Sequence, residues 1–220
     1  MKQVKAVFTG CAFRRDKMNV QDCLQILRDV KDVAFATVDE KGMPQVRIID
    51  VMLAENEKIY FCTARGKDFY AQLMRDNHVA VTAVNQDFQM VRLSGTAEKL
   101  TEQKYWIDRI FRENPSMNSV YPKESRYILE PFCIANANIE FFDLSREPID
   151  RENFFMGENK EQKKGFDISV SCIGCGRCRK ICPQQCISAG KPYKINQNHC
   201  LHCGLCFENC PVKAIKRRSV

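Results

Sequence analysis

Eight of the thirteen cysteines fall into two runs near the end of the 220-residue chain. The run CIGCGRCRKICP begins at Cys172, and the run CLHCGLCFENCP begins at Cys200. Both runs have cysteines at the same offsets and end in proline, so they form an internal repeat. The spacing Cys-x2-Cys-x2-Cys-x3-Cys-Pro is typical of thiolates that bind a four-iron, four-sulfur cluster. The chemistry that we infer for this region is one-electron transfer.

The alternative chemistry for these thiolates is a pair of zinc sites. Zinc takes four ligands, typically as two Cys-x2-Cys pairs. Each run here has a third and a fourth cysteine at fixed spacing, so we favour iron–sulfur clusters over zinc. The remaining five cysteines are scattered: Cys11, Cys23, Cys62, Cys133 and Cys186. Scattered free cysteines are common in a reducing compartment, so we expect a cytoplasmic protein. The sequence has no apolar run of about 18 residues, so it predicts no membrane span.

Residues 166–220 resemble the bacterial two-cluster ferredoxins through both complete runs. This resemblance implies that each run supplies three ligands to one cluster and its fourth ligand to the other. Cluster one would then be bound by Cys172, Cys175, Cys178 and Cys210, and cluster two by Cys200, Cys203, Cys206 and Cys182. Two residues within the repeats are left over from these ligand sets. We expect Cys186 to be an inert small residue and His202 to be a solvated loop residue.

The positive charge of the chain is concentrated in the cysteine-rich part. Residues 163–220 carry eleven Lys or Arg and two acidic residues, whereas the whole chain has a net charge of only +7. A basic surface around the clusters favours an acidic electron donor, such as a free ferredoxin or flavodoxin. Basic residues near the C-terminus would also suit nucleic acid, but no recognition motif accompanies them. We therefore expect neither a nucleic-acid partner nor a membrane partner.

The first 144 residues alternate short strand patterns with two or three helix patterns. A helix is expected after the N-cap Asn19 up to Val30. Strands are expected at 33–38, 45–53, 58–63, 78–84 and 89–100, helices at 66–77 and 101–114, and an extended region at 126–144, broken by Pro131. This pattern predicts a mainly β fold with α-helices, an antiparallel barrel with flanking helices. Residues 145–165 are polar and charged and predict a linker, and residues 166–220 predict a small α+β ferredoxin-like domain.

Two features of the predicted barrel suit a phosphate group. Arg47 lies within an apolar strand pattern, and the sequence TARGK, from Thr63 to Lys67, stands between a strand and a helix. A hydroxyl, a lysine and the first amides of a helix together suit an anion, and an arginine completes such a clamp. The alternative is that Arg47 is a surface residue paired with Asp50.

Residues 19–144 resemble the pyridoxamine 5'-phosphate oxidase-like family of FMN-binding split barrels. The landmarks are the patterns FATVDEKGMPQVR at 35–47, YFCTARGK at 60–67 and VRLSGTAEKL at 91–100. The resemblance implies that Arg47 and Lys67 bind the FMN phosphate with Thr63 beside them. It places Ile48, Ile49 and Asp50 along the edge of the isoalloxazine ring, with Cys62 flanking the ring and Gln89 on a facing strand. It also implies a homodimer with two FMN sites at its interface.

The combination of domains predicts an oxidoreductase. Electrons would enter singly through the clusters, collect on FMN and leave to a small organic acceptor under anaerobic conditions. The segment with which true pyridoxamine phosphate oxidases bind their substrate has no counterpart, so oxidation of vitamin B6 is not expected. No Gly-x-Gly-x-x-Gly sequence follows a strand pattern, which excludes a Rossmann nicotinamide site. One alternative is an electron relay between protein partners, with no substrate of its own. Another is a haem- or redox-sensing protein, but the barrel part of this sequence offers no obvious axial histidine for a haem.

Overall fold

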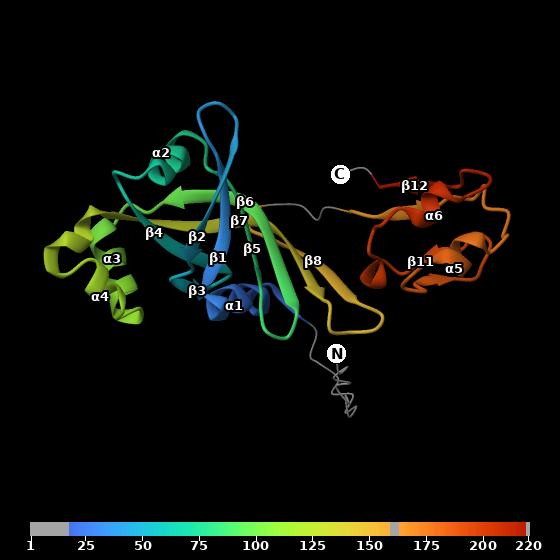
Figure 1. The fold of residues 1–220 in the computed structure, drawn as a ribbon, viewed down its shortest axis with the longest axis horizontal. Coiled ribbons are helices and arrows are strands. Elements are labelled where there is room, and N and C mark those ends of the chain that lie inside the picture. Colours follow the sequence, from blue (N-terminus) through green and yellow to red (C-terminus); the bar gives the residue numbers. More distant parts are fainter. Residues whose placement is uncertain (1–17, 159–162, 219–220) are drawn as a thin grey trace, which may run out of the picture.

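The computed structural model describes residues 18–158 and 163–218. Cys11 and the first seventeen residues of the predicted domain 1–144 lie outside the described residues. Eight antiparallel strands form one curled sheet (Figure 1): β1 (Asp32–Val38), β2 (Pro44–Asp50), β3 (Leu53–Glu55), β4 (Lys58–Ala64), β5 (His78–Val84), β6 (Gln89–Lys99), β7 (Leu129–Asp143) and β8 (Asp150–Met156). Their order is β2-β1-β5-β6-β7-β4-β3, and β8 also pairs with β7. The predicted mainly β fold is confirmed.

Helices cover the sheet and close its two hydrophobic cores. They are α1 (Val20–Val30), α2 (Asp68–Arg75), α3 (Gln103–Glu113), the short α4 (Met117–Val120) and the 3-10 helix η1 (Lys123–Ile128). Asn19 caps α1, since its side chain accepts a hydrogen bond from the Asp22 amide and Asp22 bonds back to the Asn19 amide. The α1 residues Leu24 and Leu27 lie in the main core, whereas Ile107 and Ile110 of α3 close a second core against β4.

Strand β7 runs through Pro131, so the break predicted at this proline is wrong. Pro131 pairs with Cys62 of β4, and its carbonyl accepts a hydrogen bond from the Leu100 amide at 2.9 Å. Leu100 lies just past the end of β6, so the ladder between β6 and β7 stops here. The backbone N–H that Pro131 lacks is therefore not needed for a further hydrogen bond to β6. One edge of β7 therefore pairs with β6, and the other edge pairs first with β4 and then with β8.

Strand β8 corrects the linker predicted over residues 145–165. Residues 150–156 pair in register with β7, from Asp143 opposite Asp150 to Ala137 opposite Met156. The prediction missed this strand because its charged residues resemble a solvated segment. Residues 159–162 of the predicted linker lie outside the described part of the chain.

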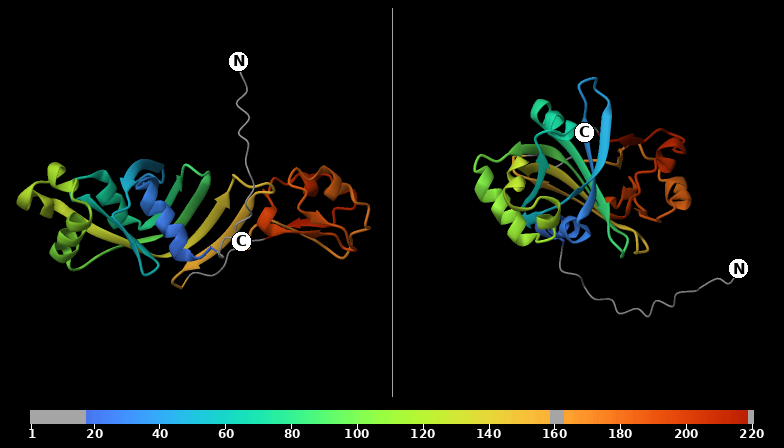
Figure 2. Two further views of the ribbon diagram at one scale, coloured as in Figure 1. Left: turned by 90° about the horizontal axis from the view of Figure 1, so that it is seen from below. Right: turned by 60° about the vertical axis from the view of Figure 1, so that its left-hand side comes forward.

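The cysteine-rich domain lies beyond β8 at one end of the elongated molecule (Figure 2). Its elements are β9 (Phe166–Ile168), α5 (Arg177–Ile181), β10 (Ile187–Ser188), β11 (Lys194–Ile195), the 3-10 helix η2 (Gln197–His199), α6 (Leu205–Glu208) and β12 (Ile215–Arg217). Strand β9 pairs with β12, and β10 pairs with β11. The segment before β8 contacts this domain, since the Ile149 amide donates to Gln184 at 3.0 Å and the Ile149 carbonyl lies 2.8 Å from Nδ1 of His199. None of the helices in the described ranges combines the length and apolarity needed to cross a membrane.

Candidate functional site

Arg47 is held above the first turn of α2 by neutral side chains. Its guanidinium donates to the hydroxyl of Thr37 and, at 2.9 Å, to Oε1 of Gln72, and it lies 4.6 Å from the centre of the Phe69 ring. Burial lowers the pKa of Arg47. Within the described ranges no carboxylate forms an ion pair with it. A partly buried cation without a counter-ion has the character of an anion site.

Asp50, the alternative partner for Arg47, is engaged elsewhere. Its carboxylate forms an ion pair with Lys31 at 3.5 Å. Burial and the neighbouring Asp32 raise the pKa of Asp50. The pair between Arg47 and Asp50 that the alternative interpretation requires is therefore not formed.

Thr63 and Lys67 lie on the two sides of the turn between β4 and α2. Thr63 is buried, and its hydroxyl has no hydrogen-bond partner among the described residues. It shares a face of β4 with Phe61, whose ring stacks on Phe69 beneath Arg47. Lys67 is exposed and immediately precedes the first turn of α2. The start of α2 thus has two cations, Arg47 and Lys67, and the unsatisfied hydroxyl of Thr63 around it. This donor set fits a phosphate.

The three residues after Arg47 divide between the two faces of β2. Ile48 points to the outer face and is 63% exposed, whereas Ile49 packs partly against the main core. Asp50 ends the strand and pairs with Asp32 of β1. Because neighbouring strand residues point to opposite faces, the three side chains do not all face one ligand held by Arg47.

Cys62 and Gln89 are not brought together with the donors at the start of α2. The Cys62 thiol lies on the other face of β4 from Thr63, in the core beneath α3, and burial raises its pKa to about 12. Gln89 begins β6 at the far end of the sheet, where it pairs with Asp143. Thr63 pairs with Glu130 at the other end of β7. The thirteen residue steps from Glu130 to Asp143 correspond to roughly 43 Å along the strand.

The predicted ligands of cluster two surround one small cavity. Cys182 of the first run lines it together with three cysteines of the second run, Cys200, Cys203 and Cys206. Burial raises the pKa of Cys206 to about 11, and the neighbouring thiols of Cys200, Cys203 and Cys182 raise it further. This arrangement brings the crossover cysteine Cys182 to the second run, as the ferredoxin resemblance implies.

Three of the predicted ligands of cluster one lie close together in the chain: Cys172 and Cys175 precede α5, and Cys178 lies in its first turn. Burial raises the pKa of Cys178, and the neighbouring thiols of Cys172 and Cys175 raise it further. The thiol of Cys210 accepts a hydrogen bond from the Ala214 amide at 3.2 Å. The assignment of Cys210 to this set stays a prediction.

The backbone before each cluster helix requires glycine. Gly176 precedes α5 with φ of 74°, and Gly204 precedes α6 with φ of 83°, both in the left-handed region. Across the described residues, no group of three or more His, Cys, Asp or Glu side chains is placed to bind a single metal ion. A zinc ion draws its four ligands onto one centre, whereas a four-iron cluster binds each thiolate to a different iron.

The two residues left over from the ligand sets are both enclosed. The Cys186 sulfur lies 3.6 Å from the Cys182 sulfur, and a hydrogen bond with Cys200 together with burial raises the pKa of Cys186. His202 was expected to be solvated, but its Nε2 is buried and has no partner among the described residues. Burial and the charge of Arg151 lower the pKa of His202 to about 4.

Several residues that shape these sites were not predicted. Thr37 and Gln72 orient Arg47, and a signal for Gln72 was its place in the apolar stripe of α2 beside Phe69 and Leu73. Arg151 and Glu140 form a buried ion pair at 2.6 Å. No pattern in the sequence distinguishes this pair from surface charges, because it depends on the pairing of β7 with β8.

Comparisons with known proteins agree with this division of the chain. Residues 20–124 match the pyridoxamine 5'-phosphate oxidase family, and residues 171–214 match the 4Fe-4S dicluster domain. Pyruvate synthase subunit PorD from Methanothermobacter marburgensis is 49% identical over 53 residues, which are 24% of this chain and 63% of that protein. The chain thus covers less than two thirds of this relative.

The fold of the barrel is shared with a solved structure. A NimC/NimA family protein from Clostridium acetobutylicum superimposes with a TM-score of 0.53 and 17% identity, covering 62% of this chain and 92% of that chain. The likeness at this identity concerns the fold. Together with the two family matches, it shows that this chain joins a split-barrel domain of the pyridoxamine 5'-phosphate oxidase type to a 4Fe-4S dicluster domain.

Proposed function

We propose that the protein is an iron–sulfur flavoprotein oxidoreductase that reduces a small organic acceptor under anaerobic conditions. Electrons enter one at a time through two 4Fe–4S clusters and pass to FMN. The observation that carries this proposal is the donor set at the start of α2, in a chain that also carries two sets of cluster cysteines. FMN, when bound, supplies a centre that accepts one or two electrons.

The phosphate of FMN is assigned to Arg47, Thr63 and Lys67. Arg47 contributes an arginine without a counter-ion among the described residues, and Thr63 contributes a buried hydroxyl with no partner there. Thr37 and Gln72 position Arg47, because they fix its guanidinium between two neutral acceptors. Lys67 adds a flexible charge that can follow the phosphate.

The separation of the proposed FMN residues supports a homodimer. Thr63 of β4 and Gln89 of β6 pair with residues near opposite ends of β7, which are separated by roughly 43 Å along that strand. This separation exceeds the length of an FMN molecule. If Gln89 contacts the flavin, it therefore contacts the flavin held by Arg47 of a second copy. Val46 and Ile48 of β2, which are 72% and 63% exposed, offer an apolar face for such a pairing.

The charge of the cluster domain supports an acidic electron donor such as a ferredoxin or flavodoxin. Its eleven Lys or Arg and two acidic residues leave a positive surface even after the clusters add negative charge. All twelve cysteines of the described ranges are free thiols. Free thiols and oxygen-sensitive clusters suit a reducing, cytoplasmic compartment.

A second candidate is an electron relay with no substrate of its own. It is favoured by the similarity to PorD, which is named as a subunit of pyruvate synthase. In this role, the flavin would exchange electrons with protein partners only. The two candidates differ in whether a small acceptor reoxidises the reduced protein.

Anaerobic purification followed by reductive titration tests the proposal. We expect about eight irons and one FMN per chain, with flavin bleaching after the clusters are reduced through an acidic ferredoxin. A panel of small organic acceptors should then reoxidise the flavin. Protein that binds no flavin, or whose reduced clusters never reduce the flavin, contradicts the proposal. Reoxidation by protein partners alone supports the relay.

A further inference from the structure

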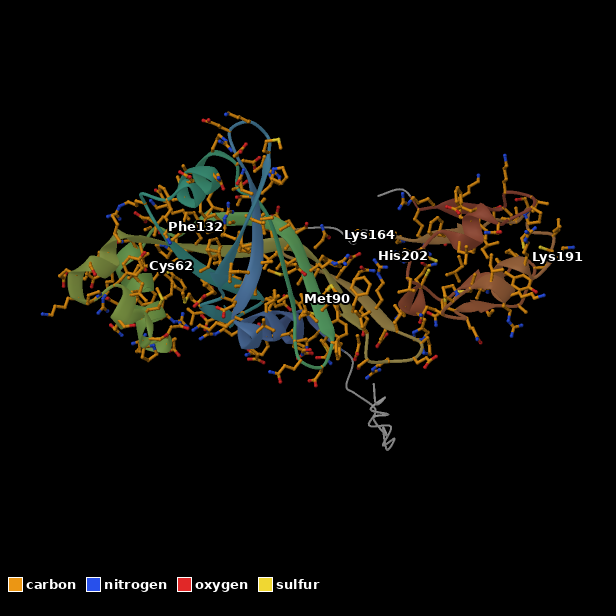
Figure 3. All side chains as sticks on the ribbon, in the orientation of Figure 1. Cys62, Met90, Phe132, Lys164, Lys191 and His202 are labelled. Carbon is orange, nitrogen blue, oxygen red and sulfur yellow. The ribbon has the colours of Figure 1, made fainter. Side chains whose placement is uncertain are left out.

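A cleft of about 780 Å³ lies between the barrel sheet and the cluster domain. The outer ends of β6 and β7 form one wall, and the loop that carries Cys200 and Cys203 forms the other. Figure 3 shows Lys164 and His202 between the two domains, with Met90 on the side of the sheet. This volume is in the range of sites for small molecules. We call this feature the interdomain cleft.

The interdomain cleft has more positive than negative charge. Five cationic side chains line it, and the carboxylate of Glu140 is the one acidic group among its lining residues. Glu140 is already engaged by Arg151 at 2.6 Å, by Lys164 at 3.2 Å and by Arg92 at 3.8 Å. Burial alone would raise the pKa of Glu140, but the bonds and charges of Arg151 and Lys164 outweigh it and lower the pKa. The single carboxylate therefore stays ionised and still leaves a cationic excess.

Two of the cations have guanidinium groups open to a ligand. Arg217 has no acidic partner within the part of the chain that the structure describes, and it lies 6.0 Å from the Phe166 ring centre. Arg92 is 57% exposed and touches Glu140 only at long range. Arg151 is 6% exposed, and its Nε has no partner among the described residues. Donors of this kind recognise carboxylate and phosphate oxygens.

Apolar side chains form most of the rest of the lining of the interdomain cleft. Phe142 carries the guanidinium groups of Arg151 at 4.5 Å and of Arg92 at 5.1 Å over its ring. Phe142 and Phe166 are themselves buried, whereas Leu144 on the barrel side and Leu201 on the side of the cluster domain are 44% and 40% exposed. A cleft that combines exposed apolar side chains with an excess of cations suits a ligand with an apolar body and an anionic group.

We propose that the interdomain cleft binds a small organic anion whose carboxylate or phosphate is held by Arg92 and Arg217 and whose apolar body packs between Leu144 and Leu201. The inference is independent of the proposed FMN site, because Arg47, Thr63 and Lys67 do not line this cleft. Binding beside the Cys200 loop places the ligand next to the predicted second cluster.

Calorimetry on the full-length chain, with its clusters loaded and FMN in excess, tests this proposal. Phenyl phosphate and benzoate serve as anionic probes, and benzyl alcohol serves as the neutral probe of similar shape. We expect at least one anionic probe to bind one site per chain, and benzyl alcohol to bind much more weakly. The comparison of phenyl phosphate with benzoate tells which anionic group the cleft prefers.

Two neighbouring residues on β12 provide a matched pair of variants. Arg217→Gln should weaken the preferred probe about tenfold, the effect of losing one charged hydrogen bond. Lys216→Gln removes the same charge one residue away, on the opposite face of the strand, and should leave binding unchanged. If Arg217→Gln disturbs the clusters, Arg92→Gln on the barrel side should give the same loss of affinity. The proposal is overturned if neither anion binds, if benzyl alcohol binds equally well, or if Lys216→Gln weakens binding as much as Arg217→Gln.

Discussion

Nη1 of Arg151 lies 3.4 Å from the backbone oxygen of Cys200, so a strand of the barrel sheet donates a hydrogen bond to the backbone of a predicted cluster ligand. The same guanidinium pairs with Glu140 and packs on Phe142. A buried cation thus stands beside the second cysteine run. The barrel and the cluster domain are therefore coupled electrostatically as well as by contact.

Arg151→Met is expected to lower the midpoint potential of one cluster and leave the other unchanged. Reduction adds negative charge near Cys200, and a nearby cation stabilises it. The expected shift is on the order of 60 mV for a unit charge roughly 10 Å away at an effective dielectric constant of about 20. Redox titration followed by electron paramagnetic resonance measures both clusters. The control Arg75→Met, on the exposed end of α2, should change neither; equal shifts in both clusters would show that Arg151 has no local role.

Arg47→Gln is expected to weaken FMN binding by about 10- to 100-fold, because a charged hydrogen bond to phosphate is lost. Fluorescence titration with FMN measures the dissociation constant. Riboflavin lacks the phosphate, so its affinity should be the same for the variant and the parent. Arg75→Gln removes an arginine from α2, the helix beside Arg47, and should not change the affinity for FMN. An equal loss for FMN and riboflavin would mean that Arg47 acts on the fold and not on the phosphate.

Thr63→Val is expected to stabilise the flavin-free protein and to weaken FMN binding. The Thr63 hydroxyl is buried and has no partner among the described residues, and an unsatisfied buried hydroxyl costs about 1–2 kcal/mol. Urea unfolding followed through Trp106, the single tryptophan, measures the free energy of unfolding of the barrel. Thr82→Val is the control, because its hydroxyl donates to the Val91 carbonyl at 2.9 Å and its removal should not stabilise. Unchanged FMN affinity in Thr63→Val would remove Thr63 from the site.

Cys182→Ser and Cys210→Ser are each expected to remove about four of the eight irons, from different clusters. In the predicted crossover arrangement, Cys210→Ser affects the cluster of the first run and Cys182→Ser that of the second. Iron and sulfide analysis with electron paramagnetic resonance distinguishes the two losses. Cys186→Ser should keep both clusters, although the Cys186 sulfur lies 3.6 Å from that of Cys182. An intact first cluster in Cys210→Ser would refute the crossover.

The sequence was informative wherever a local pattern decides the structure. The cap at Asn19, the alternation in β1 and the paired cysteine runs all act over a few residues, and the structure shows the expected helix and strands. Prediction from the sequence failed where the pairing of distant segments decides the structure. The charged residues of β8 are typical of a linker, and only the pairing of β8 with β7 brings Arg151 to Glu140. Cys62 is next to Thr63 in the sequence, but its side chain lies on the other face of the strand.

The pairing of β9 with β12 has a consequence for the independence of the cluster domain. Phe166 and Arg217 are opposite each other in the ladder, so the cluster domain begins and ends within one strand spacing, about 5 Å. A unit whose entry and exit lie side by side can be inserted into a surface loop of another protein without stretching its host. The cluster domain is thus a self-contained unit whose first and last strands hold each other.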